Sequence, residues 1–253
     1  LLGTAKTYGY DGIEPRVECK HRHGVELDTD QAARRRLKGE IDKSGLRVSC
    51  IATSCTFADP GKVQEHVKKA LGYIDLAADL GARRIRVFGG GLPDDVSRNQ
   101  AIENVGTALC SLAERAANRG VLVCLETHDH WSDPQQVAAV MKRVNHPNIA
   151  VNWDLMHPLR GGYSSIEKSF QTLKSWIRHV HIHDGLNHDG DIKMVPIGSG
   201  YVNHRKALEL LLDAGYDGHL SGEWIDWEPF DACLPREIAT MKRYEKELNG
   251  TIK

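Results

Sequence analysis

The sequence predicts an α/β fold, a (β/α)8 TIM barrel whose first strand is missing or truncated at the N-terminus. Three observations support this prediction. Strand-like and helix-like segments alternate along the 253 residues. Acidic or histidine side chains stand at the ends of several strand-like runs. Those ends recur at intervals of about 30 to 40 residues, the length of one strand-plus-helix unit. A chain of this length fits one barrel, so we expect a single domain over residues 1–253.

The predicted strands are short apolar runs bounded by turn-forming residues. The chain opens on what looks like the tail of a helix, and the first strand-like run follows almost at once. We therefore expect an upstream strand, and any signal peptide before it, to be missing from this sequence. The predicted strands are residues 12–17, 47–52, 84–88, 122–126, 149–154, 179–183 and 218–223.

The segments between these strands show the amphipathic pattern of helices that cover a sheet. Most of them end at a glycine, as in Ser44-Gly45 and Arg119-Gly120, which is typical of left-handed helix capping. The predicted helices are residues 30–44, 61–80, 100–119, 133–144, 164–173 and 204–214. Strict alternation indicates a parallel sheet with helices outside it.

An open, doubly wound sheet is the alternative fold, and the run Gly89-Gly90-Gly91 is the best argument for it. This run lacks the spacing of a dinucleotide-binding fingerprint and is followed by Leu92-Pro93. We interpret it as a loop and favour the barrel.

The bulk composition excludes several partner classes. A hydrophobic content of 41% can build a large core, and the net charge of −1 gives no electrostatic reason to expect nucleic acid or a membrane surface as a partner.

The six cysteines contain no Cys-x-x-Cys pair. Cys50 and Cys124 lie in strand-like runs and are interpreted as core residues, so we expect a reducing, cytoplasmic location. The alternative is a disulfide between Cys50 and Cys55.

Four charged or imidazole side chains stand at the ends of separate predicted strands: Glu126, Asp154, His181 and Glu223. If the strands close into a barrel, these side chains converge at one end, where such folds keep their chemistry. A buried carboxylate is costly unless it is paired or binds a metal. Three carboxylates and one imidazole predict a site for one divalent ion, preferably Mn2+, with Mg2+, Co2+ or Zn2+ as further candidates.

Other polar residues accompany these four. Alternation along a strand places His128 on the face of Glu126, and His183 on the face of His181. His128, with His130 and Trp131, would line a pocket, the alternative being a solvated loop. His183 would contact substrate or support the metal ligand.

Trp224 and the segment 198–200 each have two possible interpretations. Trp224 would form a wall of the pocket or belong to the core. Gly198-Ser-Gly200 could bind a phosphate, but it equally reads as a turn before the last predicted helix.

The motifs together resemble the xylose isomerase-like TIM barrel superfamily, in particular its sugar phosphate isomerase/epimerase branch. The resemblance covers essentially the whole chain. Its motifs are Gly9-Tyr-Asp-Gly-Ile-Glu14, Leu125-Glu-Thr-His128, Asn152-Trp-Asp-Leu-Met-His-Pro158, His179-Val-His-Ile-His-Asp184, Ile197-Gly-Ser-Gly200 and Gly215-Tyr-Asp-Gly-His-Leu-Ser-Gly-Glu223.

The resemblance assigns roles residue by residue. It makes the four converging residues named above the metal ligands. His157 matches a histidine that contacts substrate oxygen in the epimerases, and His183 stands where many members have lysine. Glu14 matches an acidic position at a strand end and is expected to contact substrate. Family members often associate, so a homo-oligomer is expected.

The resemblance also implies a reaction. A divalent ion that chelates neighbouring hydroxyl and carbonyl oxygens would acidify the C–H between them. Glu126 and Glu223, on opposite sides of a sugar, would then remove and return a proton through an enediolate. The expected activity is a sugar isomerase or epimerase with a small-molecule carbohydrate substrate. The alternative is a dehydratase or lyase acting on a keto-sugar or an inosose-like cyclic polyol.

The chain departs from the family pattern, and other functions are therefore alternatives. The related ketose 3-epimerases place an arginine where this chain has Asn187, and Lys193 is the candidate replacement. An abasic-site endonuclease would need zinc ligands where Ile192 and Met194 stand, which disfavours that activity. A sugar-binding barrel without turnover is the remaining alternative.

Overall fold

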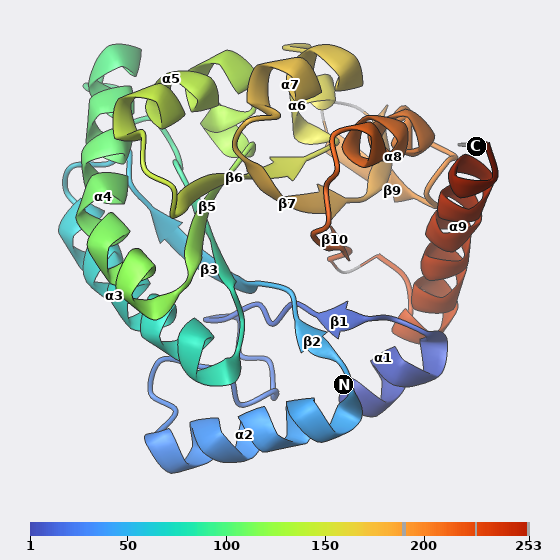
Figure 1. The fold of residues 1–253 in the computed structure, drawn as a ribbon. Coiled ribbons are helices and arrows are strands. Elements are labelled where there is room, and N and C mark those ends of the chain that lie inside the picture. The colour runs from blue at the N-terminus through green and yellow to red at the C-terminus, as the bar shows by residue number, and fades with distance from the viewer. Residues whose placement is uncertain (189–190, 226, 252–253) are drawn as a thin grey trace.

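A parallel sheet curls inside a ring of helices in the computed structural model, which describes residues 1–188, 191–225 and 227–251 (Figure 1). The main sheet contains β3 (Ile51–Thr56), β4 (Arg84–Phe88), β5 (Leu122–Glu126), β6 (Ile149–Asp154), β7 (Ile177–Ile182) and β10 (Leu220–Gly222). Their order is β10-β7-β6-β5-β4-β3, and every neighbouring pair is parallel. The predicted TIM barrel fold is confirmed.

The first strands differ from the prediction. The predicted strand at 47–52 is divided, because β2 (Arg47–Val48) pairs with β1 (Gly12–Ile13) whereas β3 begins only at Ile51. A single bridge between Arg16 and Ala52 then joins the segment after β1 to β3. This bridge holds residues 14–17 beside the main sheet and fixes one wall of the barrel opening.

The helices follow the predicted segments with shifts of one or two residues. They are α2 (Gln31–Ser44), α3 (Val63–Leu80), α4 (Arg98–Arg119), α5 (Pro134–Val144), α7 (Ile166–Leu173) and α8 (His204–Asp213). Local chemistry explains their limits. Asp30 and Ser97 accept backbone N–H groups at helix starts, and Gly45 and Gly120 end helices with φ of 77° and 64°.

Three further α-helices, a 3-10 helix and a hairpin complete the described chain. They are α1 (Leu2–Tyr8), the short α6 (His157–Arg160), α9 (Phe230–Thr251), the 3-10 helix η1 (Asp129–Trp131), and an antiparallel pair of β8 (Asp184–His188) with β9 (Asp191–Val195). Within the described residues, no helix is long and apolar enough to cross a membrane. The cysteines of the described chain are free, so the alternative of a Cys50–Cys55 disulfide is wrong.

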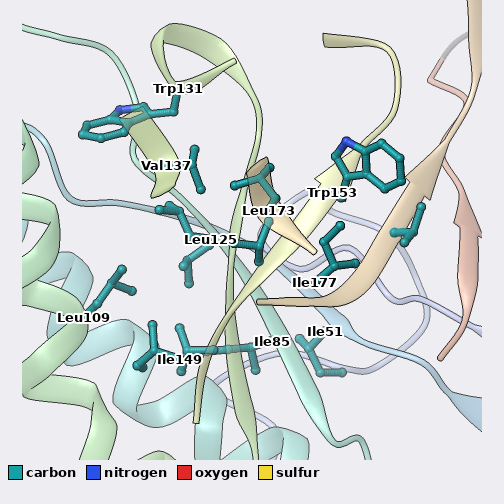
Figure 2. Close-up of a cluster of buried hydrophobic side chains, with 14 of the residues drawn as sticks. Ile51, Ile85, Leu109, Leu125, Trp131, Val137, Ile149, Trp153, Leu173 and Ile177 are labelled. Carbon is teal, nitrogen blue, oxygen red and sulfur yellow. The ribbon is translucent and has the colours of Figure 1, made fainter. Parts of the chain in front are cut away.

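The apolar core lies between the sheet and the surrounding helices. Figure 2 shows part of it, where Ile85 and Leu125 from strands lie near Leu109 from α4. These side chains are fully buried. Their contact holds the strands in place from outside, so the inner face of the sheet is left for polar groups.

The glycine run forms a loop, as predicted, and the structure supplies the reason. A Cβ at Gly89 would lie 2.2 Å from Nε1 of Trp131, and that indole nitrogen donates to the Gly90 carbonyl at 3.0 Å. Trp131 is fully buried in the core (Figure 2). The interpretation of Trp131 as a pocket residue is therefore wrong.

Candidate metal centre

The four predicted residues meet at the carboxyl ends of adjacent strands. Glu126 ends β5, Asp154 ends β6, His181 lies near the end of β7, and Glu223 directly follows β10. The sheet pairs Asp154 with His181 and His181 with Ser221, so the four positions lie at one edge. One donor atom from each residue lies within 4.8 Å of the others. This arrangement is able to hold a divalent ion.

His181 lies at the centre of the group. Its Nδ1 is 2.8 Å from Glu126 Oε1 and 3.2 Å from Glu223 Oε2, while its Nε2 is 2.9 Å from Glu14 Oε1. Burial alone would lower the pKa of His181, but Glu14 and Glu126 outweigh it and raise the pKa well above its ordinary value. Without a metal, the proton on this imidazole therefore compensates the surrounding carboxylates.

Glu14 lies behind this imidazole. Its two carboxylate oxygens contact Nε2 of His179 at 2.7 Å and Nε2 of His181 at 2.9 Å. Burial would raise the pKa of Glu14, yet the two imidazoles hold it well below its ordinary value. A carboxylate on the far nitrogen of a metal-binding histidine fixes the ring and leaves the other nitrogen facing the ion.

Asp154 is held by local backbone groups and by a third histidine. Its Oδ1 accepts the N–H groups of Met156 at 2.8 Å and His157 at 3.0 Å, while Oδ2 lies 2.9 Å from Nε2 of His183. Burial would raise the pKa of Asp154, but the charges of His183 and His157 and these contacts lower it.

The predicted histidines gather beside this carboxylate. The ring centroids of His128 and His157 are 3.9 Å apart, and those of His157 and His183 are 5.6 Å apart. The three rings therefore form a row of proton donors and acceptors next to Asp154. The structure brings His128, His157 and His183 together as their strand and loop positions suggest.

Arg86 also belongs to the site, although it was not predicted from the sequence. This residue of β4 is 1% exposed, with Nε 3.2 Å from Glu126 Oε2 and Nη2 3.8 Å from Glu223 Oε1. Its guanidinium also lies 4.0 Å from the ring centroid of Phe88. The sequence does contain an indication of this position, because Arg86 is a charged residue in the middle of the strand predicted at 84–88.

The donor set fits a divalent ion. Glu126 Oε2 and Asp154 Oδ2 are buried. Arg86 Nε lies 3.2 Å from the first and His183 Nε2 lies 2.9 Å from the second, but neither contact is a well-aligned hydrogen bond. Buried carboxylate oxygens without a well-aligned donor favour a bound cation. Three of the four candidate donors, Glu126, Asp154 and Glu223, are carboxylates, and Arg86 pairs with two of them. A hard, oxygen-rich set of this kind suits Mg2+ or Mn2+.

A cleft of about 530 Å³ opens beside the group, within the size range of ligand pockets. Its lining includes Glu14, Arg16, His21, His181, Glu223 and Trp224. Glu223 reaches the cleft with 22% of its side chain exposed, whereas Glu126 is fully buried behind it.

Two predicted substrate contacts, Trp224 and Lys193, lie in different places: Trp224 lies at the cleft and Lys193 does not line it. Trp224 lines the cleft and packs closely on Gly222, where a Cβ would lie 2.1 Å from the indole ring. Lys193 is exposed on β9 and is not among the residues that line the cleft.

The Gly198-Ser-Gly200 turn is not free to hold a phosphate. The N–H groups of Gly198 and Gly200 both donate to Asp184 Oδ2 at 2.9 Å, and Val202 N–H donates to Asp184 Oδ1 at 3.2 Å. A Cβ at Gly200 would lie 2.2 Å from the same carboxylate. This segment is a turn anchored by Asp184.

The fold and the site together define a β/α barrel with a candidate divalent-metal centre at the carboxyl ends of its strands. The chain belongs to the xylose isomerase-like TIM barrel family, whose sequence profile matches residues 2–244. The resemblance inferred from the motifs is confirmed.

Two curated relatives are similar over most of their length. The L-ribulose-5-phosphate 3-epimerase UlaE of Shigella flexneri is 26% identical over 228 residues, which cover 86% of this chain and 78% of UlaE. The uncharacterized protein MJ1311 of Methanocaldococcus jannaschii is 26% identical over 217 residues, covering 80% of this chain and 72% of that protein.

Solved structures share the fold. A xylose isomerase domain protein from Planctomyces limnophilus has a TM-score of 0.80 at 20% identity and covers 99% of this chain and 93% of its own. The probable 3-DHS dehydratase AsbF from Bacillus anthracis has a TM-score of 0.76 at 21% identity, covering 95% and 92%. A xylose isomerase-like barrel protein from Mycobacterium smegmatis, in complex with magnesium, has a TM-score of 0.75 at 20% identity, covering 98% and 88%.

Proposed function

We propose that this protein is a divalent-metal-dependent sugar epimerase or isomerase in which Glu126 and Glu223 move the proton. The observation that carries the proposal is the convergence of both glutamates on Nδ1 of His181, beside a cleft large enough for a sugar. The 26% identity to an epimerase that acts on a ketose phosphate supports the same reaction class.

Glu126, Asp154, His181 and Glu223 would hold the ion, with Mn2+ preferred and Mg2+, Co2+ or Zn2+ as alternatives. Such an ion would stabilise negative charge on neighbouring hydroxyl and carbonyl oxygens of the sugar and so acidify the C–H between them. Glu14 would keep the His181 ring in the orientation that presents Nδ1.

The two glutamates differ in a way that suits two roles. Burial would raise the pKa of Glu223, but His181 and Arg86 lower it to about 2, so this carboxylate is ionised at neutral pH. Glu126 is fully enclosed and is held between His181 and Arg86. One glutamate would remove a proton from a carbon next to the carbonyl, and the other would return one to the opposite face.

The remaining predicted contacts would position the sugar. His157 and His183 would donate to substrate oxygens from the Asp154 side, with His128 stacked next to them. Trp224 would cover an apolar face of the ring from the cleft wall. Glu14 at the cleft and Lys193 in the β9 hairpin stay predictions as substrate contacts.

A dehydratase or lyase acting on a keto-sugar or an inosose-like cyclic polyol is the second candidate. The row of His128, His157 and His183 favours it, because protonated His128 or His183 could donate a proton to a departing hydroxyl, whereas burial lowers the pKa of His157. The burial of His183 would lower its pKa, but Asp154 outweighs burial and raises it, which keeps a proton available.

The test is deuterium exchange. The chain is loaded with Mn2+ and incubated in D2O with ketoses, ketose phosphates, keto-sugars and inososes. We expect deuterium at the carbon next to the carbonyl, with at least a hundredfold loss in Glu126→Gln and Glu223→Gln, since general acid–base groups contribute roughly 100- to 10,000-fold. A product of unchanged formula indicates an epimerase or isomerase, whereas loss of water indicates a lyase. Undiminished exchange in both variants would rule out the two-glutamate mechanism.

A further inference from the structure

The cleft contains a cation that the proposed reaction does not use. Arg16 lines the same cleft as His181 and Glu223, on the wall formed by the segment after β1. The inference below concerns the substrate of that site, so it rests on the proposed function.

The backbone at Arg16 is fixed on several sides. Ala52 N–H donates to the Pro15 carbonyl at 3.0 Å, and Val17 N–H donates to the Ala52 carbonyl at 3.0 Å. The Arg16 carbonyl oxygen lies 3.0 Å from Nε2 of His23. The guanidinium is therefore carried by a rigid stretch of chain, which is the condition for a preorganised binding group.

The Arg16 side chain lacks a protein partner among the described residues. Its Nε is buried and makes no hydrogen bond, and no ion pair with a described carboxylate involves its guanidinium. A buried N–H donor without an acceptor is costly, and so is a partly buried cation without an anion. This cost is relieved if an anion occupies the cleft.

Nearby carboxylates are already engaged elsewhere. Glu14 is held by His179 and His181, and Glu18 lies 3.1 Å from Nζ of Lys69. Glu223 faces His181 and Arg86. None of these three carboxylates forms an ion pair with Arg16 among the described residues.

We propose that Arg16 binds an anionic group of the sugar, a phosphate ester or a carboxylate, while the hydroxyl and carbonyl oxygens of the same sugar face the metal centre. A guanidinium presents paired N–H donors that match two oxygens of either group. His21, on the same wall of the cleft, supplies a further ring nitrogen. The substrate class is thus a sugar phosphate or a sugar acid rather than a neutral sugar. The Gly198–Gly200 turn gives no competing anion site, because the N–H groups of Gly198 and Gly200 donate to Asp184 and that of Ser199 donates to the Pro196 carbonyl.

The experiment compares the wild type with Arg16→Gln and with the control Arg35→Gln, which removes an exposed arginine of α2. Calorimetric titration of the Mn2+-loaded proteins with inorganic phosphate and with acetate measures anion binding without turnover. We expect binding in the wild type and in the control, and a roughly ten- to hundredfold loss in Arg16→Gln, the range of one charge-assisted hydrogen-bonded contact. Metal content measured in parallel should be equal in all three.

A second arm identifies the source of the anion. For a ketose phosphate and for a ketose acid, kcat/KM is divided by kcat/KM for the corresponding neutral ketose. Both ratios are measured in the wild type and in Arg16→Gln. A drop of this ratio in Arg16→Gln for the phosphate assigns a phosphate ester, and a drop for the acid assigns a carboxylate. Wild-type protein that binds neither phosphate nor acetate, or Arg16→Gln that binds both as the wild type does, overturns the proposal. Deuterium exchange of the wild type with the ketose phosphate and the ketose acid tests the proposed function separately from anion binding, which calorimetry measures without turnover, so the two failures are distinguishable.

Discussion

His181 has a carboxylate near each ring nitrogen, Glu126 on one side and Glu14 on the other. The Glu14 contact decides which nitrogen is free for a metal, because a ring nitrogen that donates to Glu14 cannot bind an ion. Glu14 therefore acts on the metal centre through the orientation and basicity of an imidazole.

Glu14→Gln should weaken the affinity for Mn2+ by about 10- to 100-fold, the usual effect of removing a carboxylate behind a metal-binding histidine. Titration of metal-free protein followed by calorimetry measures the change. Glu40→Gln, at an exposed position of α2, is the matched control and should bind Mn2+ as the wild type does. Equal affinity in both variants would show that Glu14 does not support the centre.

Arg86 is the buried positive charge that balances Glu126 and Glu223. Arg86→Met keeps much of the volume but removes the charge, so the two carboxylates are left to repel each other. We expect the free energy of unfolding of the metal-free protein to fall by about 3–5 kcal/mol, with a smaller loss for Arg86→Lys. Urea denaturation measures it, and added Mn2+ should recover part of the loss. Wild-type stability of Arg86→Met would contradict the assigned ion pairs.

The cysteines divide by exposure. Cys110 is exposed, whereas Cys55 and Cys124 are buried, and burial raises the pKa of these thiols to about 11 and about 12. Because the thiolate is the reactive form, iodoacetamide at pH 8 to 9 should label Cys110 first and leave Cys55 and Cys124 unlabelled until the protein unfolds. Mass spectrometry of digested samples measures the order. Early labelling of Cys124 would contradict its place in the core.

Among the elements, three strands in the middle of the sheet, β4, β5 and β6, begin and end at the predicted residues. Each has a neighbour on both sides and a mostly apolar sequence. β7 also has two neighbours, but it spans Ile177–Ile182 where residues 179–183 were predicted. The strands predicted at 12–17 and 218–223 are shorter in the structure. They lie at the ends of the series, where pairing is incomplete.

The missed elements lack a periodic apolar signal. The helix α9 contains Pro235, and the β8–β9 hairpin begins with Asp184-Gly185, a pair typical of turns. The four metal-centre candidates were predictable because each stands at a strand end. Arg16 and His21 lie in an irregular segment, and only the tertiary structure brings them beside the strand ends.

The contact of Gly89 with Trp131 ties the loop after β4 to the core. Gly89→Ala would place a methyl group against the buried indole, so we expect a loss of about 1–3 kcal/mol in the free energy of unfolding. Gly91→Ala is the control, since a Cβ there meets nothing within 4 Å. Urea denaturation of both variants checks the difference, and equal stability would mean that the loop can move away from Trp131.

At the scale of the whole molecule, the candidate centre depends on residues from Glu14 to Glu223, so it assembles only when the first and last strands lie in one barrel. One continuous apolar cluster runs from Val17 to Leu248, which supports the proposal of a single domain. An ion that binds this centre in the folded state and not in the unfolded chain stabilises the fold. A homo-oligomer and a cytoplasmic location stay predictions from the sequence.

The most direct test of the account is the metal content of the purified protein after dialysis against Mn2+, measured by elemental analysis in the wild type and in Asp154→Asn. Asp154 contributes a fully buried carboxylate to the candidate ligand set, so its replacement removes a candidate ligand. The account predicts one divalent ion per wild-type chain, together with a raised melting temperature, and little or no ion in the variant. Equal metal content in both proteins, or none in the wild type, would contradict the assignment of this group as the metal centre.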